Sequence, residues 1–137
     1  MALNRSIGLL IIAAAVLAFI AVAMGAFAAH GLQTVLSEEQ LATIRTGVLY
    51  QFIHCLAVLL CCVLLAQSML KNQRRLICVS AWCFVLGVIL FSGSLYGLVL
   101  LQLSALGPVT PVGGVLFLVG WGCLTVVGSK LLRQQMV

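Results

Sequence analysis

One long uncharged stretch limits what this chain can fold into. Residues 76–129 contain no Asp, Glu, Lys or Arg. A membrane-spanning helix needs about 20 apolar residues to cross ~30 Å of hydrocarbon, so this stretch is too long for one span. Two prolines and a glycine within 106–111 interrupt it, and these residues end helices. We therefore predict two spans here, over about residues 77–103 and 112–129.

Two further apolar runs precede that stretch. The first covers about residues 7–27, and the second covers about 46–66, interrupted only by Gln51 and His54. The whole chain is 64% hydrophobic and 7% charged, whereas a soluble domain carries about 25% charged residues. We therefore predict an all-α integral membrane protein, a four-helix transmembrane bundle that forms a single domain over residues 1–137.

The first apolar run also imitates a secretory signal peptide. Arg5 precedes it, and Ala26-Phe27-Ala28 resembles an A-x-A cleavage motif. The apolar core of a signal peptide is usually about 7–15 residues long, and this run is longer. We expect an uncleaved span, and cleavage after the motif is the alternative.

Positive charge flanks the spans and predicts their orientation, because cytoplasmic loops of membrane proteins carry an excess of Lys and Arg. If the N-terminus is inside, only Arg45 lies on the outer side, together with Glu38 and Glu39. The other six cations are then cytoplasmic: Arg5, Lys71, Arg74, Arg75, Lys130 and Arg133. This bias predicts that both ends of the chain are cytoplasmic, N-in and C-in. The cations are dispersed along the span ends, so the net charge of +5 does not indicate a nucleic-acid partner.

The segment between the first two spans predicts an early helix start. Ser37-Glu38-Glu39-Gln40 matches a capping box, in which the Ser and Gln side chains satisfy each other's backbone N–H groups. We expect an outer helical extension that begins at Glu38 and continues into the second span up to Ala66. A helix of about 29 residues is ~43 Å long, so its first turns should project beyond the hydrocarbon.

Small residues repeat along faces of the predicted spans and indicate where helices approach each other. Helices in lipid pack closely where Gly, Ala and Ser line their interface. Ala14, Ala18, Ala21, Gly25 and Ala28 share one face of the first span. The glycines expected to pack are Gly87, Gly93 and Gly97 in the third span and Gly113 and Gly120 in the fourth. The alternative is that small residues are simply common in spans.

Polar side chains gather in the half of the predicted bundle that faces away from the cytoplasm. Gln51 and His54 are three apart on the second span and can meet as neighbours. Residues 91–96 of the third span reach a similar depth at 1.5 Å rise per residue. The candidate site consists of His30, Tyr50, Gln51, His54, Ser92, Ser94, Tyr96 and Thr110. We expect His54 to point into the bundle, because a polar ring that faces hydrocarbon would lack hydrogen-bond partners.

Three interpretations of this polar layer remain open. The side chains can bond to one another and only hold the helices in register, or they can form a ligand or proton site, because ionisable groups inside membranes often mark functional pathways. A histidine-bound metal or haem is the third interpretation. The two histidines lie at different depths and have no carboxylate nearby, so they fit a metal site poorly. We predict no metal and no cofactor.

The composition leaves little for catalysis. The chain has no Asp, which excludes a Ser–His–Asp triad. Its only acids, Glu38 and Glu39, are expected on the outer surface, which argues against a buried carboxylate pair. The six cysteines all lie in apolar runs without a CxxC pair, so we expect free thiols that pack as small hydrophobic groups. We predict no catalytic residue and no enzyme activity.

Four segments carry a resemblance to a known family. They are residues 25–32, Tyr50-Gln51 with His54, residues 91–96, and Thr110 to Gly114 with Gly120-Trp121. In this order the chain resembles the YgdD-like family of small bacterial inner-membrane proteins, a family of unknown function with small transmembrane relatives in eukaryotes. Ala28 stands where the family pattern has a glycine. The resemblance implies a multi-pass protein of the bacterial inner membrane with four spans and an uncleaved N-terminus, and it implies no activity.

We therefore expect an uncharacterised, non-catalytic membrane protein with a small-ligand, lipid or proton site in its outer half. One alternative is a scaffold or accessory subunit of a larger membrane complex. It would leave an exposed stripe of small residues after the bundle has formed. Another alternative is a small transporter or channel, which would have to be a homo-oligomer because four helices leave little room for a pathway. A membrane redox protein is the last alternative. The bilayer is the expected partner, and the ligand is unknown.

Overall fold

The protein is a bundle of long helices that run back and forth. The computed structural model describes residues 2–134. The described elements, in chain order, are α1 (Ala2–Ala29), α2 (Glu38–Ala66), the short 3-10 helix η1 (Ser68–Gln73), α3 (Arg74–Leu100), the 3-10 turn η2 (Ser104–Leu106) and α4 (Val109–Gln134). Within the described residues, four helical segments, one along each α-helix, are long and apolar enough to cross a membrane. The predicted all-α, four-span architecture is confirmed.

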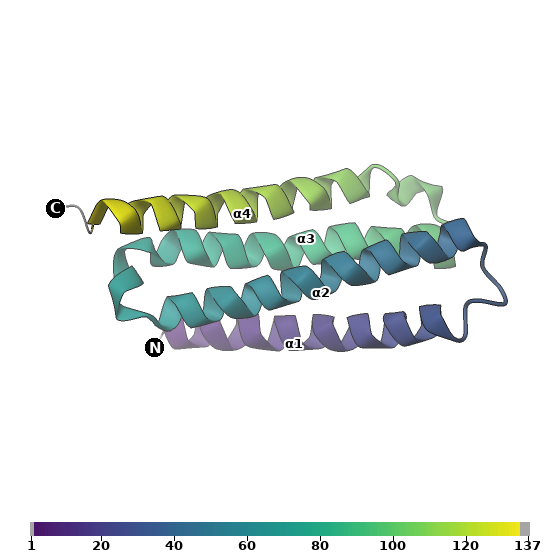
Figure 1. The fold of residues 1–137 in the computed structure, drawn as a ribbon, viewed down its shortest axis with the longest axis horizontal. Coiled ribbons are helices and arrows are strands. Elements are labelled where there is room, and N and C mark those ends of the chain that lie inside the picture. Colours follow the sequence, from purple (N-terminus) through teal and green to yellow (C-terminus); the bar gives the residue numbers. More distant parts are fainter. Residues whose placement is uncertain (1, 135–137) are drawn as a thin grey trace.

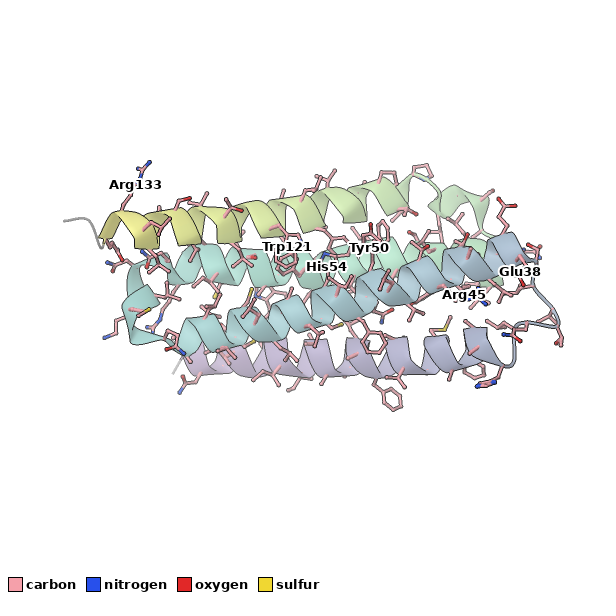
Figure 2. All side chains as sticks on the ribbon, in the orientation of Figure 1. Glu38, Arg45, Tyr50, His54, Trp121 and Arg133 are labelled. Carbon is pink, nitrogen blue, oxygen red and sulfur yellow. The ribbon has the colours of Figure 1, made fainter. Side chains whose placement is uncertain are left out.

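The helix directions bring the start of α1 and the end of α4 to the same end of the molecule (Figure 1). The α1–α2 and α3–α4 connections lie at the opposite end, which we call the outer end. Figure 2 shows Glu38 and Arg45 near the outer end and Arg133 at the other. This arrangement agrees with an even number of spans. The distribution of Lys and Arg predicts that the outer end faces away from the cytoplasm.

The central pair of helices is α2 and α3. Helix α1 packs mainly on α2 and touches α3 over a smaller area, while α4 packs mainly on α3. The main core lies towards the inner half, where Leu10 and Ala14 of α1 meet Leu65 of α2 and Phe84 of α3. On the predicted small-residue face of α1, the side chains of Ala14, Ala21 and Ala28 are buried.

Helix α2 begins as its sequence predicts. The Ser37 side chain accepts a hydrogen bond from the Gln40 backbone N–H, and the Gln40 side chain accepts one from the Ser37 N–H. The capping box therefore satisfies two backbone donors that the helix itself leaves free. The six cysteines are free thiols, as expected.

The turn between α3 and α4 differs from the predicted span bounds at both sides. Helix α3 ends at Leu100 rather than near 103, because Gln102 takes a left-handed conformation with φ 53°. The Leu103 N–H then turns back to the Gly97 carbonyl at 3.3 Å. Helix α4 begins at Val109, three residues before the predicted span. Pro111 falls in its first turn, where proline replaces an N–H that has no partner within the helix.

Three of the five predicted packing glycines lie between α3 and α4. A Cβ added at Gly120 would come 2.5 Å from the Phe84 ring, one at Gly87 would come 2.6 Å from Phe117, and one at Gly113 would overlap the Phe91 backbone. Gly97 is close to Leu106 of η2 rather than to another long helix. The expectation for Gly93 is wrong, because an added Cβ there would have no neighbour within 4 Å. The sequence therefore indicated that glycines pack between helices, but it did not show which glycines face a neighbouring helix.

Candidate functional site

The structure places Gln51 and His54 of the predicted polar layer on different sides of α2, each within its own group of contacts. The first, which we call the Gln51 group, is Gln51 and Tyr96 with the backbone of α1. The Gln51 side-chain amide donates to the Leu17 carbonyl at 2.7 Å, and the Tyr96 hydroxyl donates to the Gln51 side-chain oxygen at 2.7 Å. Gln51 is buried. The group therefore connects α1, α2 and α3 through a single amide.

Two serines add hydrogen bonds between helices at a similar level. The Ser92 hydroxyl donates to the Gly47 carbonyl at 2.8 Å, which joins α3 to α2. The Ser94 hydroxyl donates to the Phe91 carbonyl at 2.9 Å and lies 2.7 Å from the Thr110 hydroxyl, which then donates to Ser94. Both serines are buried. These bonds hold α3 in register with α2 and with the first turn of α4.

The second, which we call the His54 group, is His54 with Phe117 and Trp121 of α4. The His54 Nδ1 atom lies 2.8 Å from the Tyr50 carbonyl. A carbonyl only accepts, so Nδ1 carries the proton. The Trp121 indole N–H donates to the His54 Nε2 atom at 3.2 Å. Both ring nitrogens of His54 therefore have a hydrogen-bond partner. The imidazole is neutral, with its proton on Nδ1.

The His54 ring is held by packing as well as by hydrogen bonds. It stacks on the Phe117 ring with centroids 3.5 Å apart and planes 8° apart, and Phe84 lies against it at 5.4 Å between centroids. Only 4% of the residue is exposed. The prediction that His54 points into the bundle is confirmed. Figure 2 shows its position between α2 and α4, close to Trp121 and Tyr50.

His30 joins neither group. It is exposed in the turn after α1 and lines a hollow formed only by that end of α1, with Phe27 and Gly31 among its walls. The expectation that His30 belongs to the polar site is therefore wrong. The turn follows the last residue of α1 directly, which leaves the histidine on the outside. Within residues 2–134, no three His, Cys, Asp or Glu side chains lie together in a way that could hold a metal ion.

An open groove runs beside the His54 group, between α2 and α4, and we call it the α2–α4 groove. Its volume is about 560 Å³, and its lining includes Tyr50, Ile53, Phe91, Gly114, Leu118 and Trp121. The Tyr50 ring lies 4.7 Å from the Phe91 ring between centroids, and 40% of Tyr50 is exposed. Its hydroxyl forms no hydrogen bond with any residue that the structure describes.

Trp121 is the functional candidate that the sequence analysis missed. Its indole supplies the only donor to His54 among the described residues, and its ring forms one wall of the α2–α4 groove. The sequence carried a usable signal. Tryptophan in membrane proteins is enriched at the two interfaces, whereas Trp121 lies near the middle of α4.

Comparison with known proteins places the chain among membrane proteins without an assigned activity. The family model described as "Protein of unknown function (DUF423)" matches residues 24–114, which include Tyr50 and His54 but end before Trp121. No solved structure matches the chain.

Similar proteins occur in several bacteria. The chain is 44% identical to the UPF0382 inner membrane protein YgdD of Escherichia coli K12, over 91% of this chain and 92% of that protein. It is 41% identical to a UPF0382 membrane protein of Staphylococcus aureus, over 89% and 96% of the two chains, and 44% identical to one of Haemophilus influenzae, over 75% and 79%. The four apolar helices and the names of these relatives both indicate a membrane protein. The chain belongs to the DUF423 family, and it is a multi-pass protein of the bacterial inner membrane.

Proposed function

We propose that this is a non-catalytic membrane protein whose α2–α4 groove binds a lipid-like ligand carrying a hydrogen-bond acceptor. The observation that carries the proposal is the Tyr50 hydroxyl, which lacks a partner among the described residues although it lies within a span. Water is scarce around a group within hydrocarbon, and each unsatisfied polar group there costs several kcal/mol. A ligand carbonyl or ether oxygen in the groove would accept from it.

The walls of the groove support a ligand with a long apolar part. Ligand sites are typically clefts of about 300–1,000 Å³ with apolar and aromatic walls and few polar groups, and this groove has a volume of about 560 Å³. Leu118 and Val115 at its edge are 72% and 57% exposed. These residues lie within the fourth span, so the groove opens towards lipid and a ligand would enter from the bilayer.

His54 has a supporting role in this proposal. Both of its nitrogens are engaged by Tyr50 and Trp121, so it has no lone pair or proton to offer a ligand. Its stacking on Phe117 and its hydrogen bond with Trp121 hold these two aromatic side chains in place along the groove. A proton relay through His54 would first have to break one of these hydrogen bonds, which makes a binding role the better candidate.

Fluorescence of Trp121 tests the proposal directly. The chain has two tryptophans, so a Trp82→Phe background leaves Trp121 as the single reporter in the groove. We use methyl 9,10-dibromostearate as the probe, because its ester can accept a hydrogen bond and its bromines quench indole emission. In nanodiscs we expect saturable quenching. Tyr50→Phe should weaken the apparent affinity about two- to tenfold, the range expected for one hydrogen bond.

A filled groove supplies the matched control. Gly114→Leu puts a side chain into the groove, because a Cβ at Gly114 would meet only the Phe91 ring, at 4.0 Å. This variant should lose saturable quenching. Gly93→Leu makes the same change on α3, where an added Cβ meets nothing within 4 Å, and should retain it. Equal, non-saturable quenching in all variants would show that the probe only dissolves in the bilayer and would refute the proposal.

A second candidate role is that of a scaffold or a homo-oligomer, and one feature of α4 favours it. Gly122, Thr125 and Ser129 form an exposed stripe of small residues. Thr125 and Ser129 donate their hydroxyls to the carbonyls of Trp121 and Thr125, each at 3.0 Å, so the stripe presents no free donor. Such small faces allow close helix association in lipid. Native mass spectrometry from nanodiscs tests this role: a dimer that Gly122→Leu dissociates would support it, and a monomer that copurifies with no partner would exclude it.

A further inference from the structure

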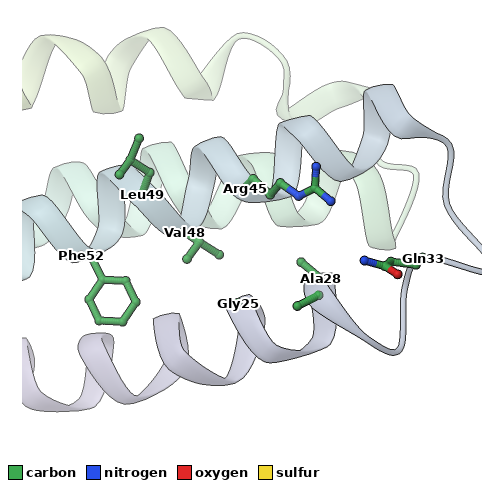
Figure 3. A pocket seen from close by; sticks show the side chains of 8 residues that line it. Gly25, Ala28, Gln33, Arg45, Val48, Leu49 and Phe52 are labelled. Atoms are coloured by element: carbon green, nitrogen blue, oxygen red, sulfur yellow. The ribbon is translucent and has the colours of Figure 1, made fainter.

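A second groove lies between the outer ends of α1 and α2, away from the α2–α4 groove. Its volume is about 420 Å³. Figure 3 shows that Arg45 and Gln33 stand at its outer end, while Val48 and Phe52 extend along its wall towards the middle of the bundle. The groove is therefore polar at one end and apolar along its length.

The floor of this groove consists of small residues of α1. Gly25 and Ala28 line it, and a Cβ added at Gly25 would meet only Val48, at 3.5 Å. The helices are thus in contact at the floor without filling the space above it. A chain of methylene groups fits an apolar groove of this kind, because it gains contacts with both helices.

The polar end carries one charge of each sign. The Arg45 guanidinium lies 4.0 Å from the Glu38 carboxylate, and the two side chains are 55% and 89% exposed. Such an exposed, long ion pair contributes little, so both groups are available to a ligand. Gln33 is exposed nearby and adds an amide donor. Arg45 and Phe52 are seven residues apart on α2, which is ~10 Å along the helix.

We propose that this groove binds one phospholipid with a zwitterionic, amine-bearing head group. The phosphodiester binds Arg45, for which guanidinium geometry is well suited, and the ammonium group binds Glu38. One acyl chain lies along Val48 and Phe52 over Gly25. The charge pair selects the head group, and the small residues of α1 make room for the chain.

Native mass spectrometry of the full-length protein in detergent tests the proposal, with titrations of phosphatidylethanolamine, phosphatidylglycerol and inorganic phosphate. In a Gly114→Leu background, where the α2–α4 groove is filled, we expect a saturable one-to-one complex with phosphatidylethanolamine. Arg45→Gln and Gly25→Leu should each weaken it about tenfold, because one removes a charged hydrogen-bond donor and the other fills the groove. Glu38→Gln should narrow the preference for phosphatidylethanolamine over phosphatidylglycerol.

Matched variants keep the result decisive. Gly8→Leu makes the same change on α1, where an added Cβ has no neighbour within 4 Å, and Arg133→Gln removes a cation at the other end of the bundle. Both should bind the lipid like the unchanged protein, and Tyr50→Phe should also do so, which separates this site from the α2–α4 groove. Equal losses in Gly8→Leu and Gly25→Leu would overturn the proposal. So would tighter binding of phosphatidylglycerol, or displacement of the lipid by inorganic phosphate.

Discussion

Gln51 and His54 are one helical turn apart on α2, yet their surroundings differ. Gln51 lies where α1 comes close enough for the side-chain amide to reach the Leu17 carbonyl, and the hollow beside it holds only about 200 Å³. His54 faces α4 across aromatic rings, beside a groove of about 560 Å³. Small residues on α1 let two helices approach, whereas the rings of Phe117 and Trp121 hold α4 away from α2. Gln51 therefore lies in a close contact between α1 and α2, whereas His54 borders an open groove between α2 and α4.

The largest expected effect comes from separating α4 from α3. Gly120→Leu forces a side chain into the space of the Phe84 ring, which an added Cβ would already approach to 2.5 Å. Overpacking of this kind costs about 3 kcal/mol, and we expect the unfolding midpoint in detergent to fall accordingly. Gly128→Leu, where an added Cβ has no neighbour within 4 Å, is the control. Equal midpoints for the two variants would show that the α3–α4 contact is not close.

The next largest effect tests whether the His54 side chain holds α4 against α2. His54→Ala removes the stacking on Phe117 and leaves the Trp121 indole without its acceptor, so we expect a loss of about 2 kcal/mol of stability. His54→Gln retains a donor and an acceptor and should recover part of this loss. Thermal unfolding of the two variants compares them. If both are as stable as the unchanged protein, His54 does not hold α4.

A smaller effect is expected from the other side of the comparison. Gln51→Leu keeps the size of the side chain but removes its bonds to Leu17 and Tyr96. Side-chain hydrogen bonds within membranes contribute about 0.6 kcal/mol each, up to about 1.7, so the loss should be about 1 kcal/mol. Hydrogen exchange monitored by mass spectrometry should rise in α1 and not in α4. Faster exchange in α4 alone would contradict the assignment of Gln51 to the α1 interface.

The smallest effect measures the Trp121 hydrogen bond apart from the packing of its aromatic ring. Trp121→Phe keeps a ring beside His54 but removes the hydrogen bond to its Nε2 atom. We expect a loss of about 0.6 kcal/mol, the average for one such bond in a membrane. Thermal unfolding measures it, with Trp82→Phe on α3 as the matched control. A loss as large as that of His54→Ala would mean that the hydrogen bond, rather than the ring stacking, holds the group together.

Much of the candidate site was visible in the sequence as residue types and depths. The position of His54 in an apolar run predicted that it turns inwards, because polar groups in hydrocarbon need partners. Gln51, Ser92, Ser94 and Tyr96 were predicted to lie at a similar depth. Which partners they find could not be predicted. The partners of Gln51 and Ser92 are backbone carbonyls of other helices, and a carbonyl carries no sequence signal. Trp121 was missed because its role depends on the rotation of α4 about its own axis.

The number of spans, their apolar lengths and the start of α2 at Glu38 follow from the sequence alone, because hydrocarbon thickness and backbone capping act on local stretches of chain. The helix faces and the two grooves were decided only by the tertiary structure. Gly93 and Gly113 look equivalent in sequence, yet an added Cβ at Gly93 would meet nothing within 4 Å while one at Gly113 would overlap Phe91 of α3. In lipid an apolar surface has no water to avoid, so hydropathy does not say which face turns inwards. Close packing of particular side chains makes that choice.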